Sequence, residues 1–314
     1  MKASWWTQNI QTRLTAYLRG TIARMRVTGL RLYPVKSLGG VAAESAVVEP
    51  WGLAGDRRWA LVDESGALVT AREVHQLLRL TAEPVDEDTV RITDRADGES
   101  ILVDTPLGLG PVPVGISRQP FLAPADEDVN AWISDRVETR LRLVWQEDPT
   151  TRPISGARGG QPGDVMNLAD AGPVLLASET SLAQLNAWIQ AESDAPDVAD
   201  LDPADLSDTE APPASEPLDI LRFRANVVVD GDDPFAEDDW PGVRIGDVDF
   251  RTTMVCDRCV MTTLDPVTLD GGKEPIRTLA RHRRWDGKTW FGTRLVRTGG
   301  GDRIGVGDPV VPLA

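Results

Sequence analysis

The two cysteines of this 314-residue chain, Cys256 and Cys259, are separated by two residues, and one of these is Arg258. A thiolate is a soft metal ligand and a strong nucleophile, but a free cysteine is mostly protonated at neutral pH. A neighbouring guanidinium or a bound metal favours the thiolate. This stretch is therefore the part of the chain whose residue types are best suited to chemistry.

The residues alone leave four interpretations of this pair open. A structural zinc site needs four Cys or His ligands, and the chain offers only His75 and His282 besides. A thioredoxin-like dithiol normally opens a helix, whereas β-branched residues and an Asp265-Pro266 turn follow here. The pair could otherwise be two small buried residues, or one cysteine could act as a metal or sulfur ligand.

The neighbouring residues predict where the pair lies. Residues 243–250 contain a turn and then alternate between apolar and polar side chains, which is typical of a strand. A second turn follows at residues 264–266. We therefore expect the cysteines at the end of a strand, where a rigid scaffold commonly presents reactive groups.

The cysteine motif continues with Thr262-Thr263-Leu264-Asp265-Pro266, Lys273-Glu274-Pro275 and Thr278-Leu279. Together these residues resemble the core motif of the MOSC domain, the molybdenum cofactor sulfurase C-terminal domain. The resemblance is to two-part proteins with an N-terminal MOSC-associated barrel, such as the mitochondrial amidoxime reducing component and bacterial reductases of N-hydroxylated bases. It implies that Cys259 binds molybdenum and that Cys256 is the more dispensable cysteine.

The first half of the chain predicts a β-barrel. Short strands separated by Gly and Asp turns are indicated over residues 27–33, 43–48, 58–62, 68–70, 78–84, 90–93 and 100–103. Apolar spacing predicts one helix over residues 128–141. We place this domain at residues 26–143 and a second, β-barrel MOSC domain with a few helices at residues 144–314, so the expected fold class is mixed and mainly β.

Two turns of the first half carry polar groups that could bind an anion. Tyr33-Pro34-Val35-Lys36-Ser37 and the glycine-rich turn ending at Arg57 would each, alone, be solvated turns. Together they resemble the MOSC-associated domain, which implies that Lys36, Ser37 and Arg57 reach the cofactor. Cationic and hydroxyl donors suit the phosphate of a pterin cofactor. Residues 69–72 also match the family, with a structural role.

The second half offers further candidate donors. After a loop over residues 148–163, a strand over 174–178 leads into a helix, and the resemblance implies that Thr180 and Ser181 lie near the cofactor phosphate, since helix N-termini favour anions. A strand over residues 221–229 would place Arg224 and Asn226 on one face. The resemblance makes both of them cofactor-binding residues, together with Arg258.

The C-terminal residues predict a helix over 275–282 and strands over 294–297 and 306–312. Gly292-Thr293-Arg294 departs from the residues that relatives often have there, so the substrate side of the site is not defined. With two histidines in the chain, general acid–base catalysis falls to solvent, metal-bound water or Asp265.

Composition and charge exclude several classes of protein. The formal net charge of −16 argues against nucleic acid as a partner, because a phosphate backbone selects for basic surfaces. Two closely spaced cysteines fit a reducing cytosol rather than a disulfide scaffold. No apolar run approaches the roughly 20 residues of a membrane-spanning helix. We therefore expect a cytoplasmic protein.

Two segments differ in composition from the rest. Residues 1–25 are basic and amphipathic, which predicts a helix on a membrane surface, a helix packed on the domain, or an extension upstream of a start at Met25. Residues 191–219 hold ten acids, five prolines and no Lys or Arg. Such a stretch buries too little apolar area to offset its ordering entropy, so we predict a disordered insertion.

The resemblance also implies the cofactor and the reaction. The molybdenum cofactor (Mo-molybdopterin) would lie between the domains and reduce the N–O bond of a hydroxylamine, amidoxime or N-hydroxylated base. The chain has no cysteine-rich ferredoxin tail, so a separate ferredoxin, flavodoxin or cytochrome with its reductase would supply electrons. The alternatives are a carrier of persulfide sulfur or of molybdenum cofactor, and an interaction module without chemistry. At the family level the resemblance extends to pyridoxal phosphate binding and detoxification.

Overall fold

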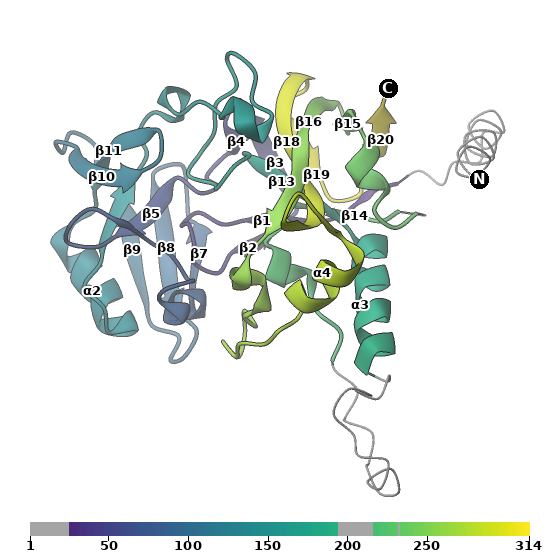
Figure 1. The fold of residues 1–314 in the computed structure, drawn as a ribbon. Coiled ribbons are helices and arrows are strands. Elements are labelled where there is room, and N and C mark those ends of the chain that lie inside the picture. Colours follow the sequence, from purple (N-terminus) through teal and green to yellow (C-terminus); the bar gives the residue numbers. More distant parts are fainter. Residues whose placement is uncertain (1–24, 194–215, 232) are drawn as a thin grey trace, which may run out of the picture.

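The structure, a computed structural model, describes residues 25–193, 216–231 and 233–314, and consists of two β-rich units (Figure 1). Strands dominate both units, and three helices lie among the described residues. The mainly β fold expected from the sequence is confirmed. The predicted helix within residues 1–25 lies almost wholly outside the described residues.

The first unit, on the left in Figure 1, contains two antiparallel sheets and one helix. One sheet has the strand order β10-β11-β12-β5-β6 and the other β7-β8-β9. Its elements are β5 (Trp59–Val62), β6 (Leu68–Val69), β7 (Leu80–Pro84), β8 (Thr89–Asp94), β9 (Ser100–Asp104), β10 (Val112–Ile116), β11 (Gln119–Pro124), α2 (Glu127–Val137) and β12 (Arg142–Trp145).

The core of the first unit forms between these sheets and α2. Leu61, Ile92 and Leu143 from the strands share one buried cluster with Ile133 from the helix, and all four are fully buried. The helix ends four residues earlier than predicted. Glu138 adopts a left-handed conformation (φ 52°), which terminates an α-helix.

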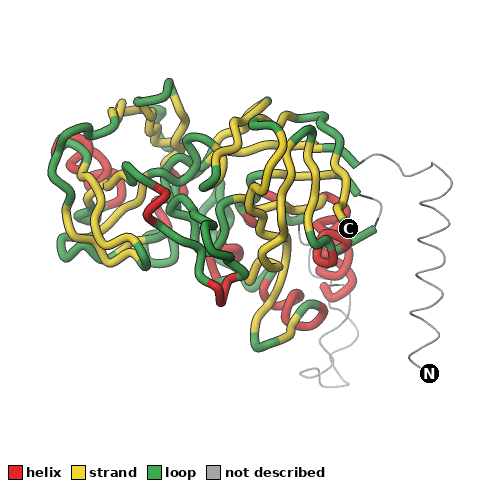
Figure 2. The backbone as a smooth tube through the Cα atoms, turned by 90° about the horizontal axis from the view of Figure 1, so that it is seen from above, coloured by secondary structure: helices red, strands yellow, loops and turns green. Residues whose placement is uncertain are grey.

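The second unit is built on one large sheet with the strand order β2-β1-β14-β13-β18-β16-β15-β20, to which β17 is added. In Figure 2 its strands run side by side, with helices beside them. Its elements are β1 (Val27–Leu32), β2 (Val41–Ala43), β3 (Ser45–Glu49), β4 (Gly52–Leu53), β13 (Val174–Ser178), α3 (Glu179–Ser193), β14 (Val227–Val229), β15 (Gly242–Ile245), β16 (Val248–Arg258), α4 (Ile276–His282), β17 (Arg284–Trp285), β18 (Lys288–Gly300), β19 (Arg303–Gly305) and β20 (Val310–Leu313).

The first strand of the chain lies inside the sheet of the second unit. In β1, Val27 pairs with Val229 and Leu30 pairs with Val227, and a bulge between Val27 and Gly29 allows both Val27 and Leu30 to face the core. Conversely, β12 spans the predicted boundary at 143/144 and pairs with β5 of the first unit. The chain therefore crosses between the two units instead of completing one before the other.

The predicted strand over residues 221–229 is wrong in its first half. Residues 220–223 form a 3₁₀ helix, and Arg224 ends it in a left-handed conformation (φ 54°). Only Val227–Val229 are extended, as β14. Arg224 and Asn226 therefore do not share a strand face, although both line the cavity described below.

The prediction of a disordered insertion over residues 191–219 is wrong at both of its ends. Helix α3 continues to Ser193, and Glu192 accepts hydrogen bonds from Thr278 and Arg281 of α4. At the other end, Leu218 exchanges two backbone hydrogen bonds with the side chain of Asn186. Residues 194–215 lie outside the described part of the chain.

These contacts change what a deletion should do. Removing residues 191–219 eliminates the Glu192 and Leu218 contacts, so we expect the melting temperature to fall by several degrees, at about 2–4 °C for each kcal/mol lost. Replacing only residues 194–215 with a Gly/Ser linker should leave it nearly unchanged, since their composition supplies few core-forming side chains. Calorimetry of both variants checks this. An equal fall in melting temperature in the two variants would show that residues 194–215 pack against the rest of the protein.

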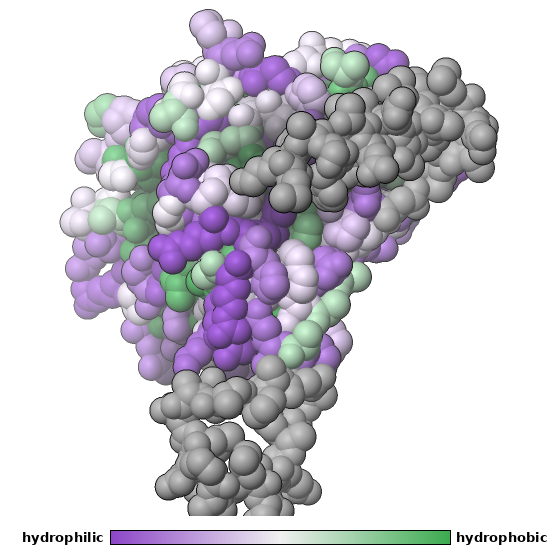
Figure 3. Space-filling view, turned by 45° about the vertical axis from the view of Figure 1, so that its right-hand side comes forward, coloured by the Kyte–Doolittle hydropathy of each residue, from purple (hydrophilic) through white to green (hydrophobic). Residues whose placement is uncertain are grey.

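On the face of the molecule shown in Figure 3, small apolar patches lie among hydrophilic side chains. No helix in the described ranges is long and apolar enough to cross a membrane.

Candidate functional site

Strand β16 carries the two cysteines into the space between the units, as the sequence predicts. It ends at Arg258, and Cys259 begins a 3₁₀ helix at Val260–Thr263. Cys256 is buried, and its sulfur accepts a hydrogen bond from Nη1 of Arg258 at 2.8 Å. Cys259 is exposed. The two thiols therefore differ in access, and Cys259 is the one that an incoming ligand can reach.

The guanidinium beside Cys259 comes from the other unit. Arg258 contacts Cys256, whereas Nε of Arg72 lies 3.4 Å from the sulfur of Cys259. Residues 69–72 were assigned a structural role from the sequence, so this contact was missed. Because the two residues lie 187 positions apart in the chain, no local spacing could indicate it.

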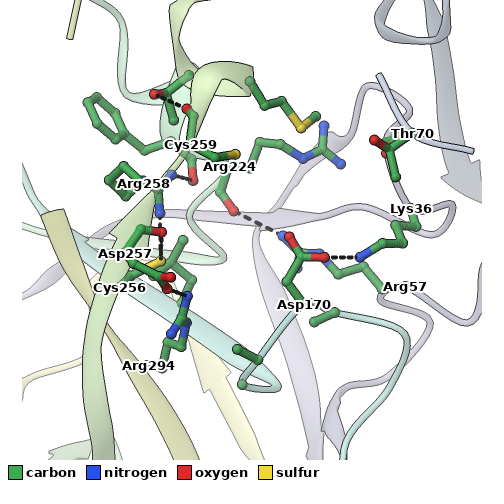
Figure 4. A pocket seen from close by; sticks show the side chains of 18 of the residues that line it. Lys36, Arg57, Thr70, Asp170, Arg224, Cys256, Asp257, Arg258, Cys259 and Arg294 are labelled. Atoms are coloured by element: carbon green, nitrogen blue, oxygen red, sulfur yellow. Dashed lines mark hydrogen bonds and ion pairs between the residues drawn. The ribbon is translucent and has the colours of Figure 1, made fainter. Parts of the chain in front are cut away.

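A cavity of about 120 Å³ lies between the units beside these thiols (Figure 4). Two carboxylates line it, Asp170 and Asp257. The cations that line it are more numerous: Lys36, Arg57, Arg72, Arg222, Arg224, Arg258 and Arg294. In a chain with a net charge of −16, such an excess of cations is suited to binding an anion.

Most of the predicted site residues are brought together here. They are Lys36, Ser37, Arg57, Arg224, Asn226, Arg258 and Cys259. Three of them have a left-handed backbone, at Ser37 (φ 73°), Arg57 (φ 48°) and Arg224 (φ 54°). A side chain in this region costs conformational energy and is common at functional sites. The fold therefore maintains strain where the predicted donors converge.

Thr180 and Ser181 do not reach the cavity, which corrects the prediction for both. The Ser181 side chain is fully buried and its hydroxyl donates to Glu237 at 2.7 Å. The Thr180 hydroxyl donates to the carbonyl of Gly231. Ser178 does cap the helix, accepting from the amide of Ser181 at 3.2 Å. These hydroxyls therefore stabilise the start of α3 and its neighbouring loops.

Asp265 also lies outside the cavity lining, which corrects its catalytic assignment. One of its oxygens accepts from Nη2 of Arg222 at 2.8 Å. The other accepts from the amides of Val267 and Thr268 at 2.8 and 2.9 Å. Such an arrangement is a turn stabilised by an aspartate side chain, so its carboxylate is engaged in structure.

The two carboxylates that line the cavity were not predicted. Asp170 pairs with Lys36 and accepts from Nη2 of Arg72 at 3.2 Å. The charge of Lys36 holds the pKa of Asp170 well below its usual value. Asp170 follows a loop with no motif, so the sequence carried no signal for it. Asp170 holds two of the cations that line the cavity, Lys36 and Arg72, in place.

Asp257 organises the opposite side of the cavity. It accepts from Nη2 of Arg294 at 2.5 Å and from Nη1 of Arg158 at 3.1 Å, and it pairs with Lys288 at 3.2 Å. Although burial raises the pKa of Asp257, these partners hold it well below its usual value. Arg294 belongs to residues 292–294, which were assigned no role from the sequence, and it lines the cavity.

A buried carboxylate ties the two units together under the cavity. Asp56 is fully buried and accepts from Nη1 of Arg57 at 2.6 Å and from Nδ2 of Asn226 at 3.0 Å. It also accepts from the amide of Tyr33 at 2.8 Å and from the side chain of Asn167. Asp56 therefore holds in place one cavity residue from each half of the chain, Arg57 and Asn226.

The donor set fits a phosphorylated metal cofactor with a thiolate ligand. Among the described residues, two arginines of the lining carry a buried nitrogen without a hydrogen-bond partner: Nε of Arg258 and Nη1 of Arg294. Buried donors without partners are costly, and burial lowers the pKa of Arg224 to about 10. An anion would supply the missing acceptors, and Cys259 supplies a soft ligand.

Fold and site together define a class: a mainly β protein of two units whose shared cavity offers cations and one exposed thiol. The family models narrow this class. Residues 24–140 match the MOSC N-terminal beta barrel domain, and residues 163–311 match the MOSC domain.

Curated relatives match both regions together. Mitochondrial amidoxime-reducing component 1 of Homo sapiens is 30% identical over 98% of this chain and 88% of its own length. The Mus musculus protein of the same name is 30% identical over 85% of this chain and 72% of its own length. Molybdenum cofactor sulfurase of Oryza sativa subsp. japonica is 27% identical over 87% of this chain but 33% of its own length. The chain therefore belongs to the MOSC family of proteins with an N-terminal MOSC β-barrel domain.

Proposed function

We propose that this protein is a molybdenum-cofactor-dependent reductase of N-hydroxylated compounds, such as hydroxylamines, amidoximes and N-hydroxylated bases. The observation that carries this proposal is the exposed thiol of Cys259 at a cavity lined by seven cations. The names of the human and mouse relatives, which match most of this chain at 30% identity, support it.

Residues from both halves of the chain would hold the cofactor. Lys36 and Arg57 from the first half, and Arg224 and Arg258 from the second, are the donors suited to its phosphate and pterin groups. Cys259 is the proposed metal ligand. When bound, the cofactor supplies the two-electron chemistry of N–O reduction. The protein binds and orients, and its cations balance negative charge in the cavity.

The proposed reductase takes electrons from a separate protein, namely a ferredoxin, a flavodoxin or a cytochrome with its reductase. We further propose a cytoplasmic location, with peripheral membrane contact through residues 1–25. Reconstitution with each class of donor tests the first point, and fractionation of full-length protein and of a variant lacking residues 1–24 tests the second.

A carrier of sulfur or of molybdenum cofactor is the alternative function. It is supported by the similarity to molybdenum cofactor sulfurase, of which this chain spans about a third. Metal analysis of the purified protein separates the two proposals. Stoichiometric molybdenum and pterin with hydroxylamine reduction supports the reductase, whereas labile sulfur on Cys259 without metal supports the carrier.

Cations from both halves of the chain should link cofactor binding to stability. A ligand that binds only the native state stabilises it, so the loaded protein should melt well above the cofactor-free protein. We expect Arg57→Gln and Arg224→Gln each to shrink this difference and to lower molybdenum occupancy, because a charge-assisted contact contributes about 1.5–3 kcal/mol. Calorimetry of both forms measures the difference.

Arg140→Gln is the matched control, since Arg140 is 85% exposed in its side chain and pairs with Glu64 at the surface. This control should keep the full difference in melting temperature. If Arg224→Gln alone narrowed the difference, the first half of the chain would take no part in holding the cofactor, and the two-unit site would be wrong.

A further inference from the structure

A second cavity has a volume of about 140 Å³. Arg224 lines both cavities. Both halves of the chain form this second cavity, with Arg31, Gly40 and Thr81 from the first half and Leu221 and Pro266 from the second. Val267 also lines it and is 65% exposed, so the cavity can be reached from solvent.

The second cavity has positive charge, and none of the described residues that line it carries a carboxylate. Arg31, Arg95 and Arg224 contribute three guanidinium groups. Each is held by backbone carbonyls: Arg31 donates to Gly40 at 2.8 Å, Arg95 to Leu78 at 2.9 Å and Arg224 to Leu38 at 2.7 Å. Within the described ranges no ion pair joins any of the three to an acid. Their charge is therefore available to a ligand.

Three buried polar atoms of residues in this lining have no hydrogen-bond partner within the part of the chain that the structure describes. They are Nε of Arg31, Nη2 of Arg224 and the hydroxyl oxygen of Tyr33. Tyr33 is only 3% exposed, and a buried phenol normally finds a partner. All three groups can donate a hydrogen bond. Unpartnered donors that surround one cavity point to a missing acceptor.

The phenol of Tyr33 is held firmly in place. The guanidinium groups of Arg57 and Arg224 lie over its ring at 4.7 and 4.2 Å from the centroid. The ring also lies against the backbone of Gly40, where an added Cβ would clash with it. The hydroxyl is therefore a fixed donor, and its lack of a partner does not reflect a side chain free to turn to solvent.

We propose that this second cavity binds a small oxyanion of the phosphate or sulfate class. Two guanidinium groups and a phenol offer several donors to the oxygens of one tetrahedral anion, and guanidinium geometry suits such oxygens. The guanidinium of Arg95 also lines this cavity and adds a third positive charge. The site is separate from the thiol of Cys259, which does not line it, and the proposal does not depend on the reductase function.

Calorimetric titration of the full-length protein with sodium phosphate, and separately with sodium sulfate, tests the proposal at constant ionic strength set by chloride. We expect saturable binding of at least one anion. Arg31→Gln and Arg95→Gln should each weaken it by about ten- to a hundredfold. Tyr33→Phe should also weaken it while leaving the melting temperature unchanged or raised, because the lost hydroxyl has no hydrogen-bond partner among the described residues.

Two controls locate the anion. Arg140→Gln removes a surface charge away from the cavity, and Lys36→Gln removes a charge that lines the first cavity but not the second. Both should keep the binding that Arg31→Gln and Arg95→Gln weaken, because neither residue lines the second cavity. Absence of saturable binding overturns the proposal. Loss of binding in Lys36→Gln with no loss in Arg31→Gln, Arg95→Gln and Tyr33→Phe also overturns it, by placing the anion in the first cavity.

Discussion

We expect the Cys259→Ala variant to hold little molybdenum and to reduce no hydroxylamine, and the Cys256→Ala variant to keep most of both properties. The reason is access. The sulfur of Cys259 is exposed at the cation-lined cavity, whereas that of Cys256 is buried against Arg258. A metal ligand must reach its metal as a thiolate. Both sulfurs have a guanidinium neighbour, but only Cys259 is exposed to an incoming metal.

Molybdenum content and steady-state hydroxylamine reduction are measured on the same preparations of the two variants. Circular dichroism of both variants shows whether either has lost its fold. Equal loss of molybdenum and activity in the two folded variants would contradict the assignment and indicate a site that uses both sulfurs. Activity retained by Cys259→Ala would remove the basis of the proposed function.

The second large effect is expected at Asp56, where an isosteric Asp56→Asn substitution should lower the free energy of unfolding by about 3–5 kcal/mol. Its carboxylate is fully buried and pairs with Arg57, whose side chain is 10% exposed. Without the negative charge, the Arg57 guanidinium remains in the interior uncompensated. Asn226, which also donates to Asp56, loses a charged acceptor at the same time.

Asp63→Asn is the matched control for this measurement. Asp63 also accepts several hydrogen bonds, from the amides of Ser65 and Ala67 and from the Ser65 hydroxyl, but it lies in a turn among exposed residues. Urea unfolding of both variants gives the comparison. If the free energy of unfolding fell by a similar small amount in both variants, Asp56 would not hold the units together. Other contacts would then set the position of Arg57.

The sequence predicted those parts of the site whose position follows from local structure. Alternation ending at a turn located Cys259 at the end of β16, and the matches to the MOSC family, now confirmed, indicated Lys36, Ser37 and Arg57. These residues lie in the cavity lining because a strand end or a tight turn places them there. Their individual roles in cofactor binding remain predictions.

The sequence could not predict contacts that depend on how the units assemble. Arg72 meets Cys259, and Asp170 meets Lys36 across 134 positions, only because the first unit packs against the second. Thr180 and Ser181 were misplaced for a related reason. A helix N-terminus attracts anions in general, but here neighbouring loops cover it and use its hydroxyls. Arg224 was misassigned to a strand because its left-handed turn has no glycine to mark it.

The position of β1 has a consequence for biosynthesis. Its hydrogen-bonding partner β14 follows roughly 200 residues later in the chain. At about 5–20 residues per second, the emerging first strand waits on the order of 10–40 seconds for that partner. A polypeptide beginning at residue 163 would, in turn, present β14 as an open edge and lack Val27 and Leu30 from its interior. Unpaired edges of this kind promote aggregation, so the MOSC region expressed alone should require a supplied β1 peptide to remain monomeric.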